Sequence, residues 1–129
     1  MKPSTKYGLL AMATLSIVSL VHFARAQAIE GPALLGHVLG VLPNTAAAVG
    51  LPFAFISIWA GQYPAALPAS HRRWFIAAIV FSAAGLIVWE FLQPNRGRVF
   101  DIQDIGATFV GSVVALLLFH AFAPRRAAI

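Results

Sequence analysis

Apolar residues occur in four long runs that are separated by short polar stretches. The runs cover residues 7–23, 36–61, 74–93 and 104–122. A helix needs about 20 mostly apolar residues to cross a bilayer, and a helix satisfies its own backbone hydrogen bonds inside lipid. The pattern therefore predicts an all-α membrane protein: a compact bundle of four transmembrane helices, in a single domain that spans residues 1–129.

The second run is longer than a straight span requires. As a helix, residues 36–61 would extend roughly 39 Å, against a hydrocarbon core of about 30 Å. Pro43 and Pro52 lie inside the run, and each removes a helix hydrogen bond. We therefore predict that this helix is kinked by its prolines. The alternatives are that its first part, GPALLGHVLG, lies at the membrane interface, or that the helix is broken and Asn44 faces a cavity.

The first run also fits a second interpretation. Lys2 and Lys6 precede it and the small-residue stretch ARAQA follows it, which resembles a secretory signal peptide. Cleavage after Ala28 would leave three spans. We expect an uncleaved helix, and the arrangement of the other three runs is the same in both cases.

Composition supports a membrane environment and excludes several classes of function. Hydrophobic residues make up 60% of the chain and charged residues 10%, against about 25% charged residues in soluble domains. The chain has no cysteine, which excludes disulfides and thiolate sites. Its net charge is +5, but the basic residues flank the apolar runs and form no solvated basic stripe. The expected partners are therefore membrane lipids and not nucleic acid.

The distribution of Lys and Arg predicts the orientation, because cytoplasmic loops carry the excess of these residues. With four spans, six basic residues share the side of both termini and three lie on the opposite side. The first set is Lys2, Lys6, Arg72, Arg73, Arg125 and Arg126, and the second is Arg25, Arg96 and Arg98. This favours an integral membrane protein with both termini in the cytoplasm.

Charge is concentrated between the third and fourth runs, in WEFLQPNRGRVFDIQDIGATFVG. Three of the four acidic residues lie here, Glu90, Asp101 and Asp104, together with Arg96 and Arg98. A charged side chain inside a membrane helix is costly and usually faces the bundle interior. We therefore expect Glu90 to point toward the other helices, with Arg96 or Arg98 as its partner.

Two interpretations of this cluster remain open. Asp101 at the start of the fourth helix and Asp104 in its first turn suit the positive end of the helix dipole, so the charges can form a structural clasp. Alternatively, they form a site in which arginines hold an anionic head group and a buried carboxylate transfers protons.

The spacing of the histidines gives no support for a metal site, and the sequence motifs give none for a cofactor. His22 and His37 share the side of the charged cluster, but no HxxxH or ExxH spacing supports a metal site, and no nucleotide or haem motif is present. We therefore expect neither metal nor cofactor. His71 and His120 are expected to be interface residues on the side of the termini.

Small residues predict where helices approach closely. Gly36 and Gly40 form a GxxxG pattern, and Gly111 with Ala115 forms a similar pair in the fourth run. Such positions let helix backbones come near each other. We expect these residues to serve packing within the monomer rather than dimerisation.

The charged stretch also resembles the signature of VanZ-like membrane proteins. That signature is approximately E-x-x-Q, then R, then D-x-x-x-N-x-x-G at the start of the last helix. The residues that fit are Glu90, Gln93, Arg98, Asp104 and Gly111, with Asp101 three residues before Asp104. Thr108 stands where the family usually has Asn, which removes a carboxamide.

The resemblance implies a small integral protein of the bacterial cytoplasmic (inner) membrane, and so of the cell envelope. Some members of the family are linked to resistance against teicoplanin-type glycopeptide antibiotics. The expected function is an outward-facing polar cluster that binds or acts on an anionic envelope molecule, such as a lipid-linked precursor. Its catalytic candidates are Glu90 and Asp104, and its binding candidates are Gln93, Arg96, Arg98, Asp101 and Thr108. The alternative is a non-enzymatic accessory subunit that binds other membrane proteins.

Overall fold

The computed structural model describes residues 1–27, 33–92 and 102–124, with side chains described from residue 40 onward in the second of these segments. These segments form four α-helices and no strand. The helices are α1 (Pro3–Ala26), α2 (Ala33–Gln62), α3 (Pro68–Leu92) and α4 (Ile102–Phe122). The prediction of an all-α bundle of four helices is confirmed.

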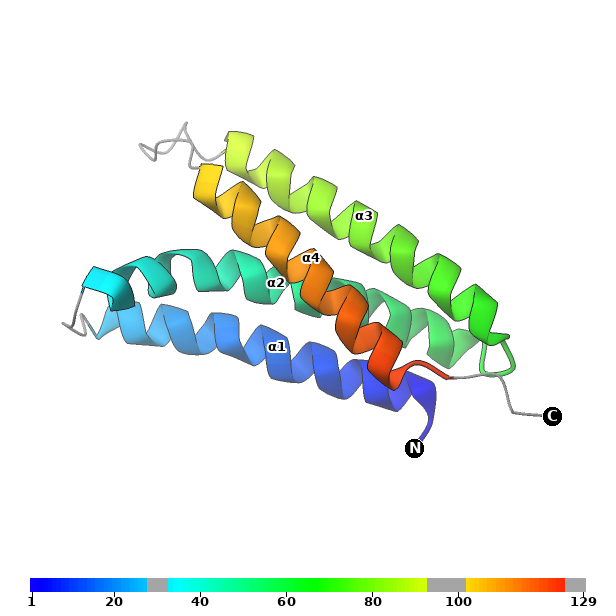
Figure 1. The fold of residues 1–129 in the computed structure, drawn as a ribbon. Coiled ribbons are helices and arrows are strands. Elements are labelled where there is room, and N and C mark those ends of the chain that lie inside the picture. Colours follow the sequence, from blue (N-terminus) through cyan, green and yellow to red (C-terminus); the bar gives the residue numbers. More distant parts are fainter. Residues whose placement is uncertain (28–32, 93–101, 125–129) are drawn as a thin grey trace.

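The four helices alternate in direction along the bundle (Figure 1). The start of α1, the turn between α2 and α3, and the end of α4 lie at one end, which we call the termini end. The ends of α1 and α3 and the starts of α2 and α4 lie at the other, which we call the Glu90 end. α2 packs against all three other helices, whereas α1 packs mainly on α2. The second helix is therefore the centre of the bundle.

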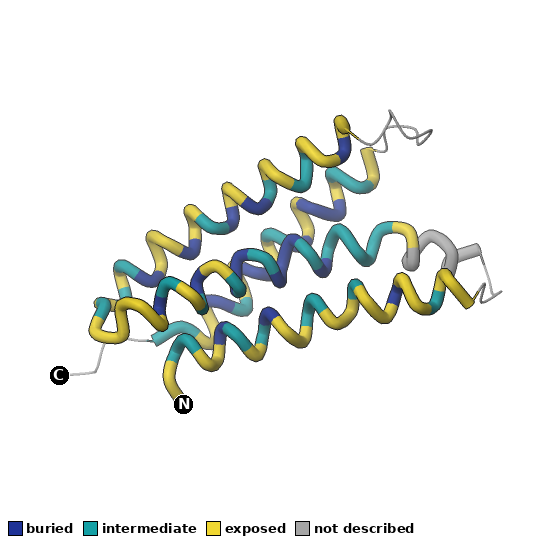
Figure 2. Tube along the Cα trace, turned by 180° about the vertical axis from the view of Figure 1, so that it is seen from behind, coloured by how far each residue is buried: buried dark blue, intermediate teal, exposed yellow. Residues whose placement is uncertain are grey.

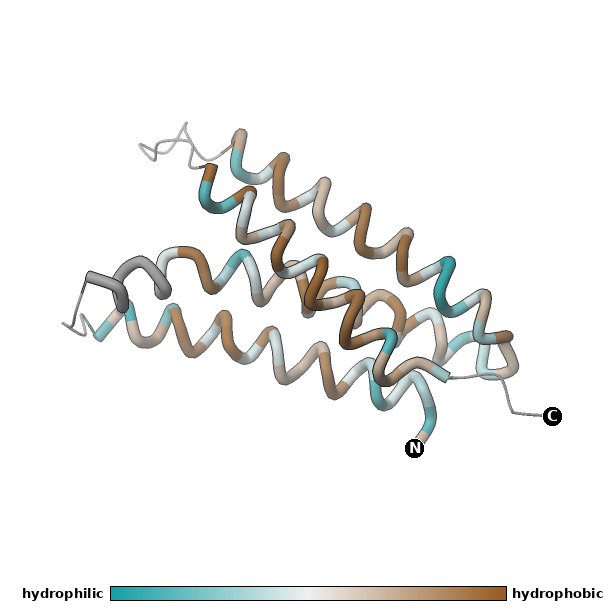
Figure 3. The backbone as a smooth tube through the Cα atoms, in the orientation of Figure 1, coloured by the Kyte–Doolittle hydropathy of each residue, from teal (hydrophilic) through white to brown (hydrophobic). Residues whose placement is uncertain are grey.

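All four helices are long and apolar enough to cross a membrane. Large apolar side chains are exposed on their outer faces, among them Leu20, Phe81 and Leu117. Figure 2 shows buried positions recurring along the helices between exposed ones, and Figure 3 shows hydrophobic residues along all four helices. An exposed apolar surface of this extent is suited to lipid and not to water. The chain is an integral membrane protein.

Each of the four helices starts before the apolar run that predicts it. The largest difference is in α3, which begins at Pro68 and not at residue 74. Proline is favourable in the first turn of a helix because its missing N–H would be unpaired there. Arg72 and Arg73 then continue the helix without a break. The predicted start was wrong because hydropathy marks where lipid contact begins, not where helix hydrogen bonds begin.

α2 is one continuous helix from Ala33 to Gln62, with Pro43 and Pro52 inside it. The alternative of a broken second helix is therefore wrong. The first part of the run, predicted in one alternative to lie at the interface, belongs to the same helix from Ala33 onward. A kink at the prolines stays a prediction.

An aromatic cluster joins all four helices near the termini end. Each helix contributes one buried ring, and these are Tyr7, Phe53, Phe75 and Phe119. Phe75 and Phe119 stack with centroids 4.3 Å apart, and Phe53 lies 4.8 Å from Phe75. Tyr7 stacks on Phe119 at 5.9 Å. Cleavage after Ala28 would remove Tyr7 from this cluster.

At the middle of the bundle, α4 approaches the backbone of α2 at a glycine. A Cβ atom added to Gly111 would meet the carbonyl oxygen of Thr45, and it would lie 2.6 Å from the Cβ of Ala48. Ala115, one turn further along α4, is fully buried. The prediction that Gly111 and Ala115 allow close packing within the monomer is confirmed. Among the described residues, a Cβ at Gly40 would meet the Arg25 side chain, at 3.8 Å. The other member of that pattern, Gly36, lies outside the described side chains.

Candidate functional site

Glu90 lies on α3, two residues before the last described residue of that helix, and it is 4% exposed. Its position follows from the buried stripe of α3, which contains His71, Phe75, Ile79, Ser82 and Glu90. These positions recur with the period of a helix, so the face that carries Phe75 into the aromatic cluster also carries Glu90 into the bundle. The prediction that Glu90 points toward the other helices is confirmed.

The structure supplies a partner for Glu90 from α2. The Nδ2 of Asn44 donates a hydrogen bond to the Oε1 of Glu90 at 3.4 Å. The sequence pointed to Arg96 or Arg98 as the partner, and both lie outside the described residues. Asn44 was considered only as part of a broken helix, so its contact with Glu90 was missed. Its position on the central helix, within the same end of the bundle as Glu90, was the available signal.

Thr45, the next residue of α2, contacts α4 on the other side of the site. The Oγ1 of Thr45 donates to the carbonyl of Ala107 on α4 at 3.2 Å. Asn44 and Thr45 therefore connect one turn of α2 to the end of α3 and to the start of α4. Because Gly111 packs against Thr45 as well, the start of α4 is held close to α2.

The first two turns of α4 carry the remaining described candidates. Asp104 is in the first turn, as predicted, and is half-buried. Thr108 is 1% exposed, and its Oγ1 donates to the carbonyl of Asp104 at 3.0 Å. The structure therefore places Thr108 inside the bundle, with its hydroxyl bonded within its own helix. The other four candidates, Gln93, Arg96, Arg98 and Asp101, lie outside the described residues.

A described cation reaches the same end of the bundle. Arg25 lies in the last turn of α1 and is exposed. Its guanidinium extends toward α2, where the Nη2 atom lies 3.8 Å from the point that a Cβ on Gly40 would occupy. The Glu90 end thus combines a buried carboxylate, a carboxamide and an exposed guanidinium, which come from three different helices.

This arrangement has a defined chemical capacity. A carboxylate that is withdrawn from lipid and water, and hydrogen-bonded by a neutral amide, can pair with a cation or exchange a proton with a bound molecule. A guanidinium can hold a phosphate or carboxylate through two parallel hydrogen bonds. The described residues place these two kinds of group at the same end of one bundle.

A second buried polar pair lies at the termini end, and sequence reasoning missed it. The hydroxyl of Tyr7 lies 3.0 Å from the Nδ1 of His71, and Trp59 packs edge-on against the His71 ring at 5.2 Å. His71 is 3% exposed, so its side chain lies inside the bundle, while its depth at the membrane interface stays a prediction. It lies four residues before Phe75 on the buried stripe of α3, and that spacing was the signal for burial. His120, by contrast, is exposed near the end of α4.

We expect Tyr7→Phe to lower the free energy of unfolding by about 1 kcal/mol, because it leaves a buried imidazole nitrogen without its hydroxyl partner. The measurement is thermal unfolding of the purified protein in detergent. Tyr63→Phe removes the same atom from a tyrosine that is 57% exposed, and it should change the unfolding midpoint little. Equal midpoints for the two variants would show that the Tyr7–His71 contact contributes nothing.

No protein-family model, curated protein or solved structure matches the chain. The resemblance to VanZ-like proteins stays a prediction from the residues quoted above.

Proposed function

We propose that the chain is a VanZ-like protein of the bacterial cytoplasmic membrane whose Glu90 end binds, or acts on, an anionic cell-envelope molecule such as a lipid-linked precursor. The observation that carries the proposal is Glu90 itself, which is 4% exposed inside a membrane helix and hydrogen-bonded from Asn44. Ionisable residues inside membrane helices are rare, because burying them is costly, and they commonly mark functional sites.

The charges of the Glu90 end support an anionic ligand. Arg25 is a described guanidinium at this end, and Arg96 and Arg98 belong to the segment that links α3 to α4. We assign the anionic group of the ligand to these guanidiniums, with Glu90 and Asp104 as the groups that pair with them or transfer a proton. With both termini in the cytoplasm, this end faces outward, where envelope precursors are used.

The hydrogen bond from Asn44 to Glu90 bears on Thr108, the residue that departs from the VanZ-like signature. The resemblance implies an Asn at position 108, where this chain has a buried Thr. In this bundle a carboxamide reaches Glu90 from α2 instead. We propose that Asn44 provides the amide function that the signature places on the last helix.

The proposal is tested by producing the full chain in a teicoplanin-susceptible bacterium and measuring the inhibitory concentration of the antibiotic. We expect the chain to raise that concentration, and we expect Glu90→Ala, Arg98→Ala and Asp104→Ala each to abolish the increase while membrane insertion is retained. Gly106→Ala is the matched control on α4, because an added Cβ there meets open space.

A direct binding measurement accompanies the growth assay. Purified protein in detergent is mixed with undecaprenyl phosphate, a lipid-linked anion, and the bound fraction is read by native mass spectrometry. The same three substitutions should weaken binding. Full activity and full binding in all three variants would refute the proposal.

The alternative, an accessory subunit of a larger membrane complex, is favoured by the exposure of α1. Only 17% of its apolar span is buried inside the bundle, compared with 39% for α2, which leaves a broad face for another protein. Stable co-migration with other membrane proteins in mild detergent would favour this alternative. Purification as a lone monomer would count against it.

A further inference from the structure

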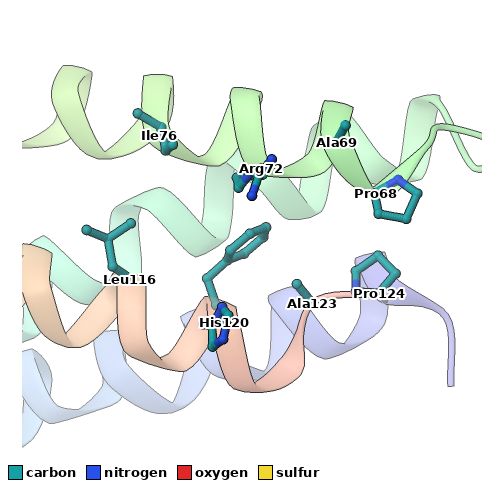
Figure 4. A pocket seen from close by; sticks show the side chains of 9 residues that line it. Pro68, Ala69, Arg72, Ile76, Leu116, His120, Ala123 and Pro124 are labelled. Carbon is teal, nitrogen blue, oxygen red and sulfur yellow. The ribbon is translucent and has the colours of Figure 1, made fainter. Parts of the chain in front are cut away.

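A groove lies between α3 and α4 at the termini end, on the opposite side of the membrane from Glu90. Its volume is about 560 Å³, which is within the range of about 300–1,000 Å³ for small-molecule sites. Figure 4 shows Arg72 and Ile76 on α3 across from Leu116 and His120 on α4. Pro68 and Pro124 lie at the outer end of the groove.

The polar and apolar residues of the groove lie at different depths. Arg72 lies one turn after the start of α3 and His120 lies two residues before the end of α4, so both are at the level of the membrane interface. Ile76 and Leu116 lie one turn deeper on each helix, and both are exposed to their surroundings. An occupant would therefore meet hydrogen-bond donors one turn inside Pro68 and Pro124, and hydrocarbon at the inner end of the groove.

The charge of Arg72 is not balanced by a described carboxylate. The acidic side chains within the described segments are Glu90 and Asp104, and both belong to the Glu90 end. Glu90 is 18 residues further along α3 than Arg72, which corresponds to roughly 27 Å. A guanidinium remains charged under all physiological conditions, so the groove attracts an anion at Arg72.

We propose that this groove binds an anionic phospholipid of the surrounding leaflet. The lipid phosphate contacts Arg72 and His120, and one acyl chain lies along Ile76 and Leu116. Basic pockets between transmembrane helices are sites for anionic lipid head groups, and the guanidinium fork matches two phosphate oxygens at once. An anionic phospholipid fits both parts of the groove, because it has a phosphate for Arg72 and His120 and a chain for the apolar walls.

The test uses the purified full chain in detergent, titrated separately with phosphatidylglycerol and with phosphatidylcholine and followed by native mass spectrometry. We expect phosphatidylglycerol to bind more tightly. Arg72→Gln should weaken its binding about fivefold, the effect of one basic residue near a lipid surface. Arg73→Gln is the matched control, because Arg73 is the neighbouring exposed arginine and does not line the groove. Arg125 and Arg126 lie outside the described residues and are left unchanged in every variant.

Two further variants test the groove without changing charge. Ala69→Phe places a ring in the groove from its α3 wall and should also weaken phosphatidylglycerol binding, while Arg72→Lys should retain part of it. Unfolding midpoints in lipid-free detergent establish that each variant is folded. Equal loss in Arg72→Gln and Arg73→Gln would overturn the proposal, because a general surface charge would then account for binding. Equal binding of the two lipids by the unchanged protein would overturn it as well.

Discussion

Gly111→Ala is expected to lower the free energy of unfolding by about 1–3 kcal/mol, the usual cost of overpacking a well-packed interior. The added Cβ would meet the carbonyl oxygen of Thr45, a backbone atom of the neighbouring helix, as well as the Cβ of Ala48 at 2.6 Å. Neither atom can turn away by changing a rotamer. α4 must therefore move from α2, and this movement also weakens the Thr45–Ala107 hydrogen bond.

Other glycines provide a graded series of controls for this expectation. A Cβ at Gly106, on the same helix, meets no atom within 4 Å, so Gly106→Ala should leave stability unchanged or raise it by up to about 1 kcal/mol through helix propensity. A Cβ at Gly50 would lie 2.7 Å from atoms of the Leu15 and Thr14 side chains, which can move. Gly50→Ala should therefore fall between the other two.

The measurement is the unfolding midpoint of the purified variants in one detergent, by heat or by a denaturing detergent. The expected order of stability is Gly106→Ala, then Gly50→Ala, then Gly111→Ala. A Gly111→Ala variant as stable as Gly106→Ala would show that α4 and α2 are further apart than the structure has them.

The number and type of helices follow from the sequence because lipid restricts the choices. A run of about 20 apolar residues has few conformations that satisfy its backbone in hydrocarbon, so residues 104–122 predict α4 almost to the residue. The same reasoning does not find the start of α3. His71, Arg72 and Arg73 lie outside the apolar run, yet their backbone continues the helix back to Pro68.

The inward direction of Glu90 could also be predicted, because a carboxylate facing lipid is too costly. The hydrogen-bond partner of Glu90 could not be predicted. Asn44 is 46 residues away in the chain, and only the packing of α2 against α3 brings the two side chains together. Reasoning along one segment of the sequence favours partners that are close in the chain. For this reason the prediction named Arg96 or Arg98, in the following loop, as the partner of Glu90.

The Tyr7–His71 pair illustrates the same limit. Each residue lies near the start of a helix and resembles an interface residue by composition. Their contact depends on α1 and α3 both approaching the aromatic cluster, in which each helix supplies one ring. No periodicity within a single run contains that information, because it concerns how four runs are arranged around one another.

Separating the charge of Glu90 from its hydrogen bond should distinguish a functional site from a structural clasp. Glu90→Gln keeps an oxygen that can accept the hydrogen bond of Asn44 and changes little in shape. It removes only the charge and the capacity to give or take a proton at that position. Asn44→Ala does the reverse, since it keeps the carboxylate and removes a donor to it.

If Glu90 acts on or binds a ligand, Glu90→Gln should abolish the increase in antibiotic resistance while the unfolding midpoint stays within about 1 °C of the unchanged protein. Asn44→Ala should lower the free energy of unfolding by about 1–3 kcal/mol, because a buried acceptor loses a hydrogen-bond donor, and the 3.4 Å length of that bond favours the lower value.

A structural clasp predicts a different combination of results. The charge would then stabilise the helix ends, so Glu90→Gln should destabilise the protein, and activity should fall only as far as the amount of folded protein does. Measuring resistance and unfolding on the same set of variants therefore decides between the two interpretations. Loss of resistance without loss of stability can arise only if the carboxylate of Glu90 contributes to function beyond holding α3 to α2.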